Sequence, residues 1–172
     1  MTEHSAASAV ALASGLQRLV NQTIRPPSEI AVSRDEPVIY MAMVRGTRGY
    51  IERVAHQANG TYANGWYDAC AVMIRRLLET LIIECYESHK IEARIKDSTG
   101  NYLFLKDLVD RVLSESTWTL GRTARAVLPK LKELGDKAAH NRRYNAHRED
   151  LDKVLKDLRD AVQELLVLSR LK

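Results

Sequence analysis

Residues that could carry out proton and phosphate chemistry gather in one short stretch, 135–147. It holds two imidazoles, His140 and His147, with two arginines between them. Histidine exchanges a proton near neutral pH, and the planar fork of arginine binds two phosphate oxygens. RNA can be cleaved without a metal when a base removes the 2′-hydroxyl proton and cations hold the phosphate. The candidate catalytic residues are therefore His140, Arg142, Arg143 and His147.

The net charge of the 172-residue chain is +4, and it is unevenly distributed. Residues 121–148 contain eight basic side chains and two acidic ones, so this segment carries +6 and the remainder −2. A local positive excess attracts anions. An anionic partner is therefore expected near the candidate residues, and RNA or a nucleotide is the candidate that their chemistry adds. A solvated connection before the last helix would have a similar composition, and it is the structural alternative.

Metal and common cofactor chemistry find little support in the sequence. If His140 and His147 lay on one helix, they would be roughly 10 Å apart, too far to share an ion. Asp136 and His140 are four residues apart and supply at most half of a metal site. Motifs of the forms G-x-x-x-x-G-K-[ST], G-x-G-x-x-G and G-x-S-x-G are absent. We expect neither a metal nor another cofactor.

Helices must position these residues, because the composition disfavours strands. With 8 Gly and 4 Pro, the chain has few of the turn residues that many short strands require. The spacing of apolar residues predicts a central helix over 66–88 and a final helix over about 149–171. Other helices are predicted over about 5–22, 38–58, 105–113 and from beyond 117 to about 139, where Pro129 kinks the helix or begins a new one.

Two regions follow from this pattern. Residues 1–37 comprise an N-terminal helix and a proline-rich connector, and residues 38–172 comprise a helical bundle. Asn59-Gly60 and Asn64-Gly65 are predicted turns. The aromatic residues either stack on RNA bases or belong to the core and its rim, as for Trp66, Tyr67, Tyr102 and Trp118.

The cysteines and the hydropathy pattern indicate a cytoplasmic protein. Cys70 and Cys85 fall on one predicted helix, roughly 22 Å apart at ~1.5 Å per residue, so they cannot form a disulfide within the chain. The positive n-region of a signal peptide is missing, and no apolar run approaches the ~18 residues that span a bilayer. We expect no membrane partner and a reducing compartment.

Two motifs carry a resemblance to a known family. Residues 66–79, WYDACAVMIRRLLE, and residues 134–140, LGDKAAH, resemble the HEPN superfamily (higher eukaryotes and prokaryotes nucleotide-binding) over roughly 40–168. The sequence is most similar to a domain of unknown function found in bacterial restriction and abortive-infection proteins. The resemblance implies an antiparallel bundle of four or five helices, commonly a homodimer. It also implies a metal-independent ribonuclease site, made by an arginine, a polar residue and a histidine across the dimer.

The resemblance assigns roles to further residues. His140 matches the family histidine and Asp136 the polar residue, but Gly135 stands where catalytic members have arginine. Arg142 and His147 repeat the spacing seven residues later. The candidate nucleic-acid or phosphate-binding residues are Asp136, Lys137, Lys132 and Arg76, of which Arg76 is expected to face the His140 region.

The expected function is that of an RNA- or nucleotide-directed module in a bacterial defence or toxin-like system. Its ribonuclease activity would use a motif that departs from the family pattern at Gly135. The alternative is a non-catalytic dimerisation or partner-binding domain. In that case Gly135 marks a site without cleavage, His140 is structural, and the partner is another protein or an antitoxin.

Overall fold

Apolar side chains recur along Tyr67–Ser88, and this segment forms α4, the longest helix that the structure describes. Because its hydrophobic residues cover a wide face, α4 can be packed from several sides at once. It contacts α3 (Gly49–Ala63), α5 (Leu105–Ser114), α6 (Arg122–His140) and α8 (Leu155–Leu168). The predicted central helix is confirmed.

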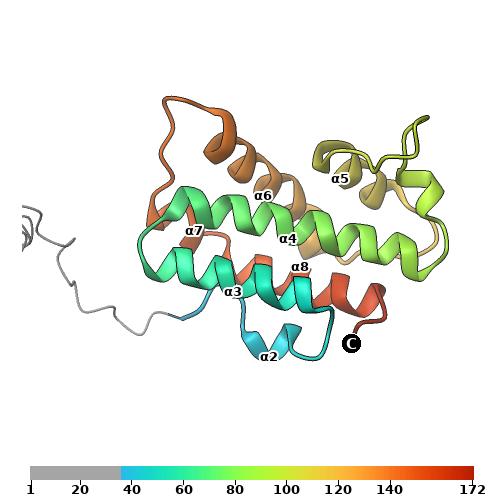
Figure 1. The fold of residues 1–172 in the computed structure, drawn as a ribbon, viewed down its shortest axis with the longest axis horizontal. Helices are drawn as coiled ribbons and strands as arrows, with labels where there is room; N and C mark the ends of the chain where they lie inside the picture. The colour runs from blue at the N-terminus through green and yellow to red at the C-terminus, as the bar shows by residue number, and fades with distance from the viewer. Residues whose placement is uncertain (1–35) are drawn as a thin grey trace, which may run out of the picture. The chain divides into compact units, whose positions relative to one another are not determined.

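The computed structural model describes residues 36–172. They form one unit with no strand, and only an isolated bridge pairs Lys96 with Tyr102 (Figure 1). The predicted all-α class is confirmed for this part of the chain. The predicted helix over 5–22 and nearly all of the connector lie outside the described residues.

Helices α3 and α6 run antiparallel to α4 (Figure 1). Figure 1 shows α3 and α4 side by side, joined by a short turn, and α6 crossing α4 in the opposite sense. The turn contains Gly65 with a φ of 74°, which favours glycine, so the Asn64-Gly65 prediction is confirmed. Pro129 lies inside α6 and does not begin a new helix.

The prediction of one helix over 38–58 is wrong. The structure has a short α2 (Met41–Val44), a break, and then α3. Gly46 has a φ of 79°, a conformation that ends a helix and that side chains rarely adopt. Asn59-Gly60 makes no turn but lies within α3, where the Asn59 side chain bonds the backbone of Ile39.

The final helix is also interrupted. It consists of α7 (Arg148–Asp152) and α8, separated at Lys153 and Val154. The apolar stripe continues across the interruption, and its main members are buried: Leu151, Leu155, Leu158, Ala161, Val162 and Leu165. The pattern therefore identified the core face correctly while missing the break in the backbone.

The 3-10 helix η1 (Glu92–Ile95) interrupts the predicted polar segment between α4 and α5. Ile95 is fully buried and anchors it to the core. Searching residues 36–172 reveals no helix that is long and apolar enough to cross a membrane.

Candidate functional site

One face of α6 carries Lys132, Asp136 and His140, which follow one another at four-residue spacing. The Asp136 carboxylate lies 3.0 Å from Nζ of Lys132 and 3.0 Å from Nε of Arg75 on α4. Although partial burial raises the pKa of Asp136, hydrogen bonds from Lys132 and Arg75 bring it below its ordinary value. Asp136 is therefore ionised at neutral pH and joins α6 to α4.

Gly135 has a packing role. It is buried where α6 crosses α4, and a Cβ there would lie 2.7 Å from Cβ of Arg75 and 3.2 Å from the Ala71 carbonyl oxygen. No side chain fits that space unless the helices move apart. The close crossing of α6 and α4 thus explains why position 135 holds glycine and not the arginine that the HEPN resemblance implies.

Arg75 brings a guanidinium to this position from another helix. Its Nη1 lies 3.5 Å from the Glu79 carboxylate, and the two residues form an i,i+4 pair along α4. Its Nε also donates to Asp136. Sequence reasoning missed this second contact because 61 positions separate the two residues. The only local signal was a glycine in a helix-forming stretch, which is typical of close backbone approach.

The connection between α6 and α7, residues 141–147, is held by its backbone. The N–H of Ala146 donates to Asp68 in the first turn of α4 at 2.8 Å, and the N–H of Arg143 donates to Asn141 at 3.0 Å. The N–H of His147, the N-cap residue of α7, donates to the Asp150 carboxylate at 3.0 Å. The Ala146 bond ties the connection to the N-terminal end of α4, and the other two bonds hold the connection and the start of α7 locally.

The candidate catalytic residues all lie at this end of the bundle, and all are exposed. Among residues 36–172, the side chains of His140, Arg142 and Arg143 have no hydrogen-bond or ion-pair partner. Lys137 instead pairs with Glu133 on α6, with 2.7 Å between Nζ and the carboxylate. The arginines of the connection are therefore available to an external anion.

Arg76 does not join this group. It borders a hollow of about 290 Å³ between α3 and α4, together with Tyr50 and Glu84. Tyr50 donates a hydrogen bond to Glu84, a carboxylate with only 6% of its side chain exposed. The structure thus turns Arg75, not its neighbour, toward Asp136.

The aromatic residues divide between core and surface. Trp118 is buried against the rings of Tyr86 and His89, so it belongs to the core. Trp66 is 63% exposed at the N-cap of α4, two residues before Asp68, which holds the connection. Trp66 could therefore stack on a base at this end.

Metal ligands do not come together in the described part of the chain. Among residues 36–172, no group of three or more His, Cys, Asp or Glu side chains is arranged to hold an ion. Cys70 and Cys85 are both buried and free, and burial raises the pKa of each thiol to about 12.

Comparison with known proteins places the sequence in a family. The search of curated proteins and the search of solved structures both return no match. A family model described as "Domain of unknown function (DUF4145)" matches residues 56–172, well over half of the chain. The match runs from within α3 through α8 and includes both α4 and the α6–α7 connection. The chain therefore belongs to the DUF4145 family.

Proposed function

We propose that this DUF4145 chain binds RNA through the α6–α7 connection and cleaves it without a metal. One observation carries the proposal: Arg142, Arg143 and His140 are exposed and unpaired among residues 36–172. Two neighbouring cations of α6, Lys132 and Lys137, are already bound to carboxylates. Arginines without an internal partner can bind phosphates without breaking an existing ion pair.

The chemistry follows from the imidazoles. His140 takes the proton of a ribose 2′-hydroxyl, whose oxygen then attacks the adjacent phosphorus while Arg142 and Arg143 hold the phosphate oxygens. The bond to the 5′-oxygen breaks, and this oxygen receives a proton from a second imidazolium, for which His147 is the candidate. The products are a 2′,3′-cyclic phosphate and a 5′-hydroxyl.

The Asp136 network supports His140. Asp136 and His140 lie one turn apart on the same face of α6, and Asp136 is fixed by Arg75 and Lys132. This fixation keeps the last turns of α6 against α4. Arg75 is thus a positioning residue, and it supplies the guanidinium that Gly135 cannot.

The resemblance to HEPN proteins adds an expected oligomeric state and an expected biological role. A second copy of this chain would bring two α6–α7 connections together, and the module would act in a bacterial defence or toxin-like system. Sedimentation of the purified chain tests the dimer, and growth after expression in bacteria tests toxicity.

Gly135 favours a second candidate function, a non-catalytic interaction domain. Its packing leaves no space for the arginine of the catalytic pattern. In that case the exposed connection docks a partner protein, and His140 has no chemical role.

Incubation of labelled RNAs with the full chain in EDTA distinguishes these functions. We expect cleavage to 2′,3′-cyclic ends, abolished in His140→Ala, and RNA binding weakened at least about tenfold in the double variant Arg142→Gln/Arg143→Gln. The control Arg53→Gln/Lys156→Gln removes the same charge from exposed positions on α3 and α8. Binding without cleavage would overturn the ribonuclease activity, and neither binding nor cleavage would overturn the whole proposal.

A further inference from the structure

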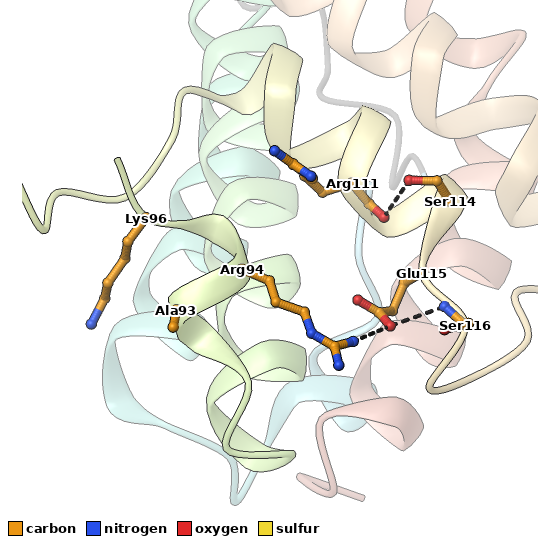
Figure 2. Close-up of a pocket in the computed structure, with 7 residues that line it drawn as sticks. All are labelled: Ala93, Arg94, Lys96, Arg111, Ser114, Glu115 and Ser116. Carbon is orange, nitrogen blue, oxygen red and sulfur yellow. Dashed lines mark hydrogen bonds and ion pairs between the residues drawn. The ribbon is translucent and has the colours of Figure 1, made fainter. Parts of the chain in front are cut away.

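A polar hollow of about 460 Å³ lies at the other end of α4, between η1 and the C-terminal end of α5. Figure 2 shows its lining, which includes the cations Arg94, Lys96 and Arg111 and one carboxylate, Glu115. Its volume falls within the ~300–1,000 Å³ of small-molecule sites. Three cations and one acid leave an excess of two positive charges.

Glu115 is a buried and firmly held part of the lining of the hollow. Only 6% of its side chain is exposed, and its Oε1 accepts the backbone N–H groups of Ser116 at 2.9 Å and Thr117 at 3.0 Å. Although burial raises the pKa of Glu115, hydrogen bonds from Thr117, Arg94 and Ser116 lower it to about 2. The carboxylate is thus ionised, and its Oε1 is held by the protein.

Glu115 fixes Arg94 without using all of its donors. Nη1 of Arg94 donates to Glu115 at 2.7 Å and lies 3.2 Å from the Thr117 hydroxyl. Its Nε and Nη2 make no hydrogen bond or ion pair within residues 36–172. Figure 2 shows this guanidinium reaching Glu115. A guanidinium oriented by a buried acid, with donors to spare, is prepared to bind an anion.

Arg111 and Lys96 supply the remaining charge. The Arg111 guanidinium has no hydrogen-bond or ion-pair partner among residues 36–172, although it borders the hollow from α5. Nζ of Lys96 lies 4.9 Å from the ring centroid of Tyr102, which leaves its charge unneutralised. We propose that this hollow binds a small phosphate compound, whose dianion matches the excess of two positive charges and whose oxygens accept from Arg94 and Arg111.

The hollow is a depression that is open to solvent and has a small, defined lining. It lies between two elements and is lined by short side chains, Ala93, Ser114 and Ser116, beside the cations. These serines can bond hydroxyl groups of a ligand, and the lining offers no broad apolar surface for an aromatic base. A small hydroxylated phosphate ester suits it better than a polymer.

Calorimetric titration of the full chain tests this site. The probes are ribose 5-phosphate, ribose, inorganic phosphate and an RNA decamer with hydroxyl groups at both ends. We expect ribose 5-phosphate to bind and ribose not to bind. Tighter binding of ribose 5-phosphate than of inorganic phosphate assigns the site to an ester, and equal binding assigns it to the free ion.

Arg111→Gln is the most direct variant, because it breaks no hydrogen bond or ion pair within residues 36–172. It should weaken phosphate binding about tenfold and leave the melting temperature unchanged. The matched control Arg53→Gln removes one exposed charge from α3 and should change the affinity by less than about twofold. Failure of both phosphate probes to bind, or equal losses in the two variants, would overturn the site. Displacement of ribose 5-phosphate by the decamer would overturn it too, because the hollow would then belong to an RNA surface.

Discussion

The two ends of α4 present positive charge in different ways. At the N-terminal end, Arg142 and Arg143 project from an exposed connection and lack partners in the described chain. At the C-terminal end, Arg94 is fixed by the buried carboxylate of Glu115 inside a hollow. Exposed cations on a backbone-held connection suit a long anion of variable shape. Oriented cations around a small hollow suit a small ligand.

Between these ends, α4 and α6 cross in close contact. Gly135 allows the helices to approach, and Arg75 and Asp136 bind beside it. The candidate site therefore depends on close packing, whereas the hollow depends on Glu115. The following variants perturb each part of this comparison separately.

The largest effect is expected at Gly135. Gly135→Ala places a Cβ 2.7 Å from Cβ of Arg75, so the helices must separate, and the free energy of unfolding should fall by about 1–3 kcal/mol. Gly135→Arg should prevent α6 from docking. The control is Gly60→Ala in α3, where a Cβ meets nothing within 4 Å. It should stabilise the protein by about 0.5–1 kcal/mol. Urea unfolding measures both, and a stabilised Gly135→Ala would contradict the tight crossing.

The second effect concerns Glu115 and depends on pH. The folded pKa is lowered from 4.5 to about 2, so the ionised group stabilises the fold above the unfolded pKa, and this contribution is lost as the pH falls toward 2. Glu115→Gln should cost about 2 kcal/mol at pH 7 and progressively less between pH 4.5 and 2. Glu149→Gln, at an exposed position in α7, should show no such pH dependence. Urea unfolding over this pH range tests it, and a constant difference for Glu115→Gln would refute the account of the hollow.

Asp136 should show a smaller effect, because a third of its side chain is exposed. Asp136→Asn removes the charge that holds Arg75 and Lys132 and should destabilise the fold by about 0.5–1 kcal/mol. Glu133→Gln on the same helix breaks only the exposed pair with Lys137 and should leave the stability nearly unchanged. Equal losses in the two variants, measured by thermal unfolding, would show that the α4–α6 bridge has no special role.

The sequence predicted elements well where one face was strongly apolar, as in α4 and α5. It missed the breaks after α2 and α7. Gly46 turns the chain through a left-handed conformation, and the interruption at Lys153 leaves the apolar stripe intact. Periodicity detects the buried face but not a short interruption of the backbone.

The candidate site was predicted in part. The histidines and arginines of residues 135–147 were found because they are contiguous. The contact of Arg75 with Asp136 was missed, since it depends on how two helices cross. The buried carboxylate of Glu115 was missed for the same reason: its partner Arg94 is 21 positions away. Long-range pairs of this kind have no local pattern.

The salt dependence of RNA binding tests the central claim most directly. Each phosphate contact on a single strand contributes about 0.7 to the slope of log affinity against log salt. The account predicts that Arg142→Gln/Arg143→Gln reduces this slope by about 1.4 and that Arg111→Gln leaves it unchanged. An unchanged slope in the double variant would contradict the assignment of RNA to the α6–α7 connection.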